Sequence, residues 1–226
     1  MITSKQYRLM REHDAFKHFT VQQFDVLSSH AMFRKLPRNQ ILFFEGDVRD
    51  KLYFIHKGYA KIEQYNALGD FVYLDFVKEG TFFPYGGMFV DEFYHYTATA
   101  MTDMEVFYIP TEMYERMLRH NVDQMQSLCQ KISNILRFHE LKLRNLLTKS
   151  ATDRVVQALT VLYLDLAQKS KQLPFPLTTQ ELAKLSGTTR ETVSKVLKQL
   201  EKERAIKYVK KIITYTNPQF FSQHIE

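Results

Sequence analysis

The stretch from Ser186 to Glu203 has the sequence SGTTRETVSKVLKQLEKE, in which a glycine and two threonines precede a run of helix-forming residues. A threonine stands three residues before a glutamate in Thr178–Glu181 and again in Thr188–Glu191, so we expect each segment to be a capping box that begins a helix. Gly187 lies between the two expected helices and favours a tight turn there. This combination predicts a helix-turn-helix.

The second expected helix is amphipathic. Its apolar residues, which are spaced to face inward, are Val193, Val196, Leu197 and Leu200. Its outer face begins with Arg190 and Glu191, which can donate to guanine and accept from cytosine in a DNA major groove. An alternative stays open, in which Glu191 only closes the capping box, Arg190 only pairs on the surface, and the helical hairpin binds another protein.

Two short β-prone segments follow this helix, Ile206–Val209 and Ile212–Tyr215, and they predict a wing. The lysines between them are expected to contact phosphates and so to contribute affinity and register. The full set of expected DNA-contacting residues is Thr178, Thr179, Thr188, Thr189, Arg190, Glu191, Ser194, Lys195, Lys198, Lys210 and Lys211. The charge distribution agrees with this set. Up to Thr148 the chain has 18 basic and 18 acidic residues, whereas after Thr148 it has 13 basic and 7 acidic residues.

A long helix is expected before this basic module. Its apolar positions follow a heptad pattern, in steps of three and four residues, at Val122, Met125, Cys129, Ile132, Leu136, His139, Leu143 and Leu146. So narrow a stripe favours pairing with a second copy of the helix, and packing against the rest of the chain is the alternative. His139 is expected to make a polar contact that fixes register, and Cys129 to fill space in a reducing cytosol rather than to form a disulfide.

A hinge is predicted at residues 148–151. Ser150–Asp153 resembles an N-capping box that starts another helix, from Val155 to about Gln168, with Val156, Leu159, Leu162 and Leu166 on one side. Upstream, residues 40–110 contain short segments rich in aromatic and β-branched residues between turn signals, which predicts an antiparallel barrel or sandwich. The first forty residues are expected to form short helices with Phe16, Phe19, Phe24 and Leu27 on the apolar face.

Composition limits the function classes. A length of 226 residues suggests one or two domains, and no apolar run approaches the length of a membrane span, so we expect a cytoplasmic protein with no membrane partner. The single cysteine cannot supply the ligands of an iron-sulfur or zinc site, and no cofactor or metal is expected. The sequence contains no Gly-x-Ser-x-Gly, P-loop or His-Glu-x-x-His motif, so it does not predict an enzyme.

The order of these parts resembles the Crp/Fnr superfamily of bacterial transcription regulators. The most specific likeness is Arg190–Lys195, RETVSK, which is similar to the family's recognition-helix motif, and the turns Glu45–Asp47 and Gly80 also match. The resemblance implies an α+β fold over nearly the whole chain. Its parts would be an N-terminal β-roll of the cyclic-nucleotide-binding jelly-roll type with N-terminal helices (1–117), a long dimerisation helix (118–148) and a C-terminal winged helix-turn-helix (149–226).

The same resemblance implies that Arg190 and Glu191 contact the G·C pairs of a TGTGA-like half-site, and that Ser194 and Lys195 contact neighbouring bases or phosphates. The implied partners are double-stranded DNA, a second copy of the chain and RNA polymerase. The branch of the family that this chain resembles is the group of arginine-catabolism or Flp-like regulators.

The chain departs from the family where cyclic AMP is held. Residues 83–89, FPYGGMF, and Tyr94–Thr97 lack the carboxylate and the arginine of cyclic-AMP-binding members, so we expect no response to cyclic AMP. The oxygen-sensing branch needs an N-terminal cysteine cluster, which this chain lacks. The candidate effector-pocket residues are Tyr85, Gly86, Gly87, His95, Tyr96 and Thr97. Two alternatives stay open, an aromatic core without a pocket and a DNA-binding protein that needs no ligand.

Overall fold

The computed structural model describes residues 2–66, 68, 71–148 and 150–223, without the side chains of residues 71, 72, 141, 142 and 144–148. The chain forms two compact units, Met1–Arg137 and Phe138–Glu226. Each unit is described by itself below.

The first unit contains two four-stranded antiparallel sheets. In spatial order, the first has β1 (Met32–Leu36), β8 (Met104–Pro110), β3 (Lys51–Lys57) and β6 (Thr81–Phe83); the second has β2 (Ile41–Phe43), β7 (Thr97–Ala100), β4 (Ala60–Tyr65) and β5 (Phe71–Val77). Side chains alternate between the two faces of a strand, and on β5 Leu74 and Phe76 are buried whereas Tyr73 and Asp75 are half-buried. The predicted jelly roll is confirmed.

Aromatic side chains fill two cores in this unit. One core includes Phe43, Tyr53, Phe83 and Tyr94 together with small residues such as Ala98. The other joins the sheet to the N-terminal segment, whose predicted apolar residues are all buried: Phe16, Phe19, Phe24 and Leu27. The second core therefore holds the N-terminal helices on the roll.

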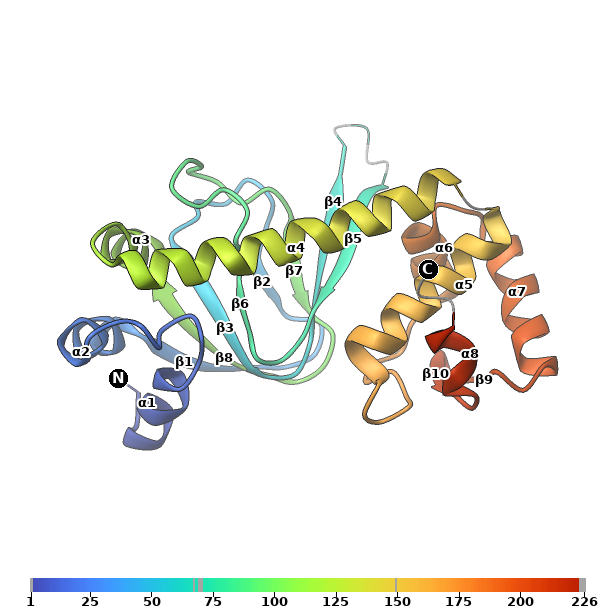
Figure 1. Ribbon diagram of the computed structural model, residues 1–226, viewed down its shortest axis with the longest axis horizontal. Helices are drawn as coiled ribbons and strands as arrows, with labels where there is room; N and C mark the ends of the chain where they lie inside the picture. The colour runs from blue at the N-terminus through green and yellow to red at the C-terminus, as the bar shows by residue number, and fades with distance from the viewer. Residues whose placement is uncertain (1, 67, 69–70, 149, 224–226) are drawn as a thin grey trace. The chain divides into compact units, whose positions relative to one another are not determined.

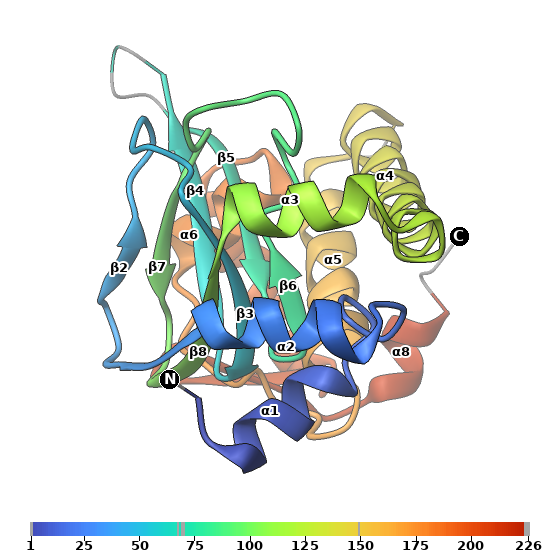
Figure 2. The same cartoon turned by 90° about the vertical axis from the view of Figure 1, so that its left-hand side faces the viewer.

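The N-terminal helices are α1 (Ser4–Arg11) and α2 (Val21–His30), and both begin with a capping box. Helix α3 (Thr111–Arg119) follows β8 directly, and Figure 2 shows α2 and α3 lying side by side next to β8. This arrangement brings the end of β8 and the start of α3 to the surface near α2.

Helix α4 (Val122–Thr148) is the long helix that the sequence predicts (Figure 1). Asn121 caps its start, because the Asn121 side chain accepts a hydrogen bond of 2.9 Å from the Gln124 amide. Gln124 and Leu128 are buried in the first unit, and the Gln124 side chain bonds to backbone atoms of His18 and Asp14 at 2.9 and 3.0 Å. One face of α4 is thus fixed to the roll.

The second unit contains α5 (Ala151–Leu162), a π-helical turn (Tyr163–Ala167), α6 (Thr179–Ser186), α7 (Arg190–Lys202), β9 (Ile206–Val209), β10 (Ile212–Tyr215) and α8 (Pro218–Ser222). The predicted N-cap at Ser150 is confirmed, because its hydroxyl accepts from the Asp153 amide at 3.2 Å, and the helix begins at Ala151 rather than at Val155. Of the predicted apolar face, Leu159 and Leu162 are buried, whereas Val156 and Leu166 are half-buried and their neighbours Val155 and Tyr163 are buried. Leu166 lies in the π-helical turn, where the wider repeat changes the direction of successive side chains.

Candidate nucleic-acid interface

Helix α6 and the turn after it have the predicted geometry. The Thr178 hydroxyl accepts from the Glu181 amide at 3.1 Å while the Glu181 carboxylate accepts from the Thr178 amide at 2.9 Å, so the first capping box is confirmed. Gly187 ends α6 in the left-handed conformation, with φ of 56°. A side chain is disfavoured there, which explains the glycine between the two helices.

The second capping box was predicted one residue too early. Thr188 belongs to the end of α6, because its amide donates to the Ala183 carbonyl at 3.0 Å. Helix α7 is instead capped by Thr189, whose hydroxyl accepts from the Thr192 amide at 3.3 Å. Glu191 is therefore not the partner of a capping box.

Glu191 is exposed in the first turn of α7. Hydrogen bonds from its own backbone amide and from the Thr189 hydroxyl lower the pKa of the Glu191 carboxyl, and the positive charge of Arg190 adds to this effect. Glu191 is thus held as an ionised hydrogen-bond acceptor at neutral pH, the form that can bind the amino group of cytosine.

The two faces of α7 separate as predicted. The four predicted inward residues, Val193, Val196, Leu197 and Leu200, are all buried. On the outer face Arg190, Glu191, Lys195 and Lys198 are exposed and Ser194 is half-buried. The helix therefore offers a continuous polar and mainly basic face to solvent. At the start of α6, Thr178 and Thr179 are half-buried.

Arg154 on α5 fixes the turn between α6 and α7, and sequence reasoning missed it. Its Nε donates to the Ser186 carbonyl at 2.9 Å, and its Nη2 donates to the Gly187 carbonyl at 2.8 Å. A cation near the carbonyl end of α6 also interacts favourably with the helix dipole. The available sequence signal is that Arg154 is the one basic residue of α5.

The wing is a tight hairpin. Ile212 pairs with Val209, and Lys210 and Lys211 form the two-residue turn between the strands, with φ of 51° and 65°. Two successive left-handed residues are the mark of a type I′ turn, which matches the twist of the strands. Both lysines are exposed, so the predicted phosphate contacts are accessible.

The predicted heptad stripe on α4 is largely open in the single chain. Val122 is 82%, Leu136 58% and Leu143 58% exposed, and Ile132 and Cys129 are exposed as well. Met125 packs partly on the core of the roll, and His139 is half-buried. The side chain of Leu146 lies outside the described residues. An apolar stripe of this kind on a helix is typical of an interface.

The candidate effector-pocket residues lie in different surroundings. Tyr85 packs on the core under the N-terminal helices, whereas Tyr96 packs on the core around Phe43. His95 is exposed and lies 2.7 Å from the Asp91 carboxylate. Gly86 is exposed, while Gly87 and Thr97 are half-buried. The structure therefore does not gather the two tyrosines in one cluster, and burial raises the pKa of each.

Two family models match this chain. The model described as "Cyclic nucleotide-binding domain" matches residues 33–121, and the model described as "Crp-like helix-turn-helix domain" matches residues 153–221. The chain belongs to the Crp/Fnr family of transcription regulators. The predicted family is confirmed, and the residues on which the resemblance was based lie within the two matched segments.

Curated relatives agree with this assignment. The chain is similar to the global nitrogen regulator of Synechocystis sp., with 29% identity over 193 residues, 82% of this chain and 85% of the relative. It is also similar to the cAMP-activated global transcriptional regulator CRP of Salmonella typhimurium, with 28% identity over 196 residues, 83% of this chain and 91% of the relative. These relatives are regulators and not enzymes.

Solved structures share the fold. FixK2 from Bradyrhizobium japonicum superposes with a TM-score of 0.72 at 20% identity, over 85% of this chain and 96% of that one. A transcriptional regulator of the CRP/FNR family from Thermus thermophilus superposes with a TM-score of 0.67 at 23% identity, over 85% of this chain and 97% of that one. Within the described residues, no helix has both the length and the apolar character that crossing a membrane requires.

Proposed function

We propose that this regulator acts as a homodimer that binds a pseudo-palindromic DNA site with TGTGA-like half-sites through α7. The observation that carries the proposal is the face of α7 that begins with Arg190 and Glu191, which is exposed and polar while the opposite face is buried. The correction at Thr189 strengthens it, because the Glu191 carboxylate is not needed to cap the helix.

The side chains of this face suit different parts of a DNA duplex. Arg190 can donate two hydrogen bonds to guanine, and ionised Glu191 can accept one from cytosine. Ser194, Lys195 and Lys198 follow along the helix and would contact neighbouring bases or phosphates. Thr178 and Thr179 at the start of α6, Thr188 and Thr189 in the turn, and Lys210 and Lys211 of the wing would fix position on the backbone.

The exposed stripe on α4 supports the dimer. Val122, Ile132, Leu136 and Leu143 would lose their exposed apolar surface against the same residues of a second copy, together with Met125, Cys129, His139 and Leu146. A two-fold axis along α4 would then present two α7 helices to half-sites about one helical turn apart. We retain the domain division 1–117, 118–148 and 149–226 as part of this proposal.

The proposed regulator responds neither to cyclic AMP nor to an iron-sulfur cluster. Residues 83–89 and 94–97, where the resemblance places the carboxylate and the arginine of cyclic-AMP-binding members, contain neither group. A cyclic phosphate in the roll would therefore lack the charge-assisted partner that it needs. The single Cys129 cannot build a cluster. The proposal has four further parts. The regulator contacts RNA polymerase and acts in the cytoplasm. It binds an effector near Tyr85 or Tyr96, and it belongs to the arginine-catabolism or Flp-like branch.

Selection of bound duplexes from random DNA tests the proposed function. We expect an enriched pseudo-palindrome, and binding of the enriched duplex that weakens steeply as salt rises, because counterions are released from the phosphates. A scrambled duplex of the same length is the control. No enrichment, or equal binding of both duplexes, would favour the alternative of a helical hairpin that binds protein.

A further inference from the structure

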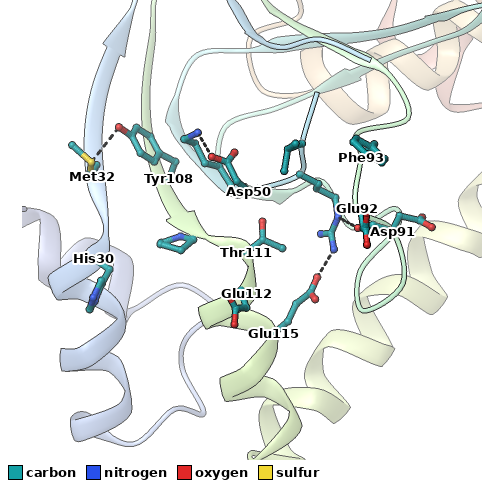
Figure 3. A pocket seen from close by; sticks show the side chains of 14 residues that line it. His30, Met32, Asp50, Asp91, Glu92, Phe93, Tyr108, Thr111, Glu112 and Glu115 are labelled. Atoms are coloured by element: carbon teal, nitrogen blue, oxygen red, sulfur yellow. Dashed lines mark hydrogen bonds and ion pairs between the residues drawn. The ribbon is translucent and has the colours of Figure 1, made fainter. Parts of the chain in front are cut away.

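A pocket of about 730 Å³ opens in the first unit, and none of the candidate effector-pocket residues lines it. It lies where the end of α2, the end of β8 and the start of α3 meet the loops around residues 48–51 and 91–93. In Figure 3, Thr111 and Glu115 of α3 lie on one side of it, and Asp91 and Glu92 lie on the other. None of the sequence-predicted sites includes these residues.

Two hydrogen-bonding groups of the pocket lining are buried without a partner. Arg49 is only 6% exposed; its Nε donates to the Asp91 carbonyl at 3.1 Å and its Nη2 to Glu115 at 2.6 Å, yet its Nη1 has no partner among the described residues. The Thr111 hydroxyl also has no hydrogen-bond partner among the described residues, and Thr111 is 5% exposed. A buried donor without an acceptor is unfavourable, so a ligand that supplies an acceptor here would recover free energy on binding.

The start of α3 adds to this donor set. Pro110 occupies the N-cap position and makes no side-chain cap hydrogen bond, and the Thr111 amide donates to the Asp50 carbonyl at 3.0 Å. The helix runs for nine residues, so its N-terminus carries a partial positive charge next to Thr111. Arg49, Thr111 and the helix start together form a site for the oxygen atoms of a carboxylate.

The rim of the pocket is acidic, which limits the ligand further. Asp91 lies against His95 and Asp50 against Lys51, at 2.7 and 2.6 Å. Glu92 and Glu112 are exposed and take part in no ion pair within the described part of the chain. A simple anion would meet repulsion from these carboxylates, whereas a molecule that also carries ammonium groups would be attracted.

We propose that this pocket binds a small zwitterion of the α-amino-acid class. The carboxylate would accept from Arg49 Nη1, from the Thr111 hydroxyl and from the first turn of α3, and the ammonium groups would lie toward Glu92 and Glu112. Both unpaired atoms lie beneath the pocket surface, so binding includes the rotation of rim side chains such as exposed Phe93. Because Glu92 and Glu112 both lie at the rim, a ligand with a second cationic group should bind more tightly. Lysine is the amino acid that we use to probe this preference.

Titration calorimetry of the full chain with lysine, leucine and glutamate tests this proposal independently of DNA binding. We expect lysine to bind once per chain, leucine to bind severalfold more weakly, and glutamate to bind at least tenfold more weakly than lysine. The double change Glu92→Gln and Glu112→Gln should remove the preference for lysine over leucine.

Thr111→Val is the deciding variant, because the Thr111 hydroxyl makes no hydrogen bond that its removal would break. We expect it to weaken lysine binding at least fivefold with an unchanged circular dichroism spectrum. Glu79→Gln, at an exposed glutamate outside the pocket, is the matched control and should bind like the parent chain. The proposal is overturned if no amino acid gives saturable binding, if glutamate binds as tightly as lysine, or if Thr111→Val binds like the control.

Discussion

Replacing Arg154 by methionine should loosen the turn on which the position of α7 depends. The change keeps an unbranched apolar stem but removes the donors to the Ser186 and Gly187 carbonyls. The bond to Ser186 is partly buried, and a hydrogen bond from a charged group in such a place is worth about 1.5–3 kcal/mol. The bond to Gly187 is exposed and adds less, roughly 0.5 kcal/mol.

A local loss of about 2–3.5 kcal/mol corresponds to a roughly 30- to 300-fold rise in the opening equilibrium of the turn, at about 1.4 kcal/mol per factor of ten. Amide hydrogen exchange, followed by mass spectrometry on peptides that span residues 182–193, measures this rise directly. Far-UV circular dichroism during urea denaturation gives the loss for the whole unit, since the chain has no tryptophan to report it.

The same variant should lose specific DNA binding more than non-specific binding. The lysines of the wing and of α7 remain able to contact phosphates, but the side chains in the first turn of α7 would no longer be held at the bases. Lys169→Met, which changes an exposed cation elsewhere in the second unit, is the control. Exchange rates and DNA specificity that match between the two variants would refute the assigned role of Arg154.

The other predictions concern the contacts to DNA bases, the dimer interface, the role of Cys129 and the response to cyclic nucleotides. Glu191→Ala should cost about 1–3 kcal/mol at a single base pair, whereas Lys210→Ala should weaken all sequences alike and reduce the salt slope by about one; competition binding with half-site variants separates the two effects. Leu136→Lys should give monomers in sedimentation because two charges would be desolvated at the axis, while Asn134→Lys on the same helix should stay dimeric; a dimeric Leu136→Lys chain would place the interface elsewhere. Cys129→Ser should leave DNA binding intact under reducing conditions, and a severalfold redox switch in the parent chain alone would contradict this. Calorimetry with cyclic AMP and cyclic GMP should show no micromolar binding coupled to tighter DNA binding.

The helix-turn-helix could be predicted because its determinants are local. The Thr178–Glu181 capping box, Gly187 and the apolar spacing of α7 act within a few residues of one another, and each has the predicted place in the structure. The error of one residue at Thr188 has a local cause as well. Two patterns compete for this threonine, a capping box ahead of it and the end of α6 behind it, and the hydrogen bond to the Ala183 carbonyl decides between them.

The residues that sequence reasoning missed depend on contacts between distant segments. Arg154 meets a turn more than thirty residues further along the chain, and Arg49 pairs with Glu115 across 66 residues. No periodic pattern in the sequence indicates the role of either arginine. The role depends on the carbonyl or carboxylate group that the fold brings close to its side chain. Only packing of the complete unit defines these partners.

The aromatic residues of the roll explain how it packs without the carboxylate and the arginine that cyclic-AMP-binding members have. Tyr94 packs face to face on Phe43 with ring centroids 3.8 Å apart, and its hydroxyl donates to the Lys51 carbonyl at 2.7 Å. Burial raises the pKa of Tyr94 to about 12, so the side chain stays neutral at physiological pH. An arginine at this position would have to bury its charge among Phe43, Phe83 and Tyr53, at a cost that a carboxylate of the chain or a bound anion would have to offset. A neutral tyrosine completes its hydrogen bond within the chain and needs no such partner.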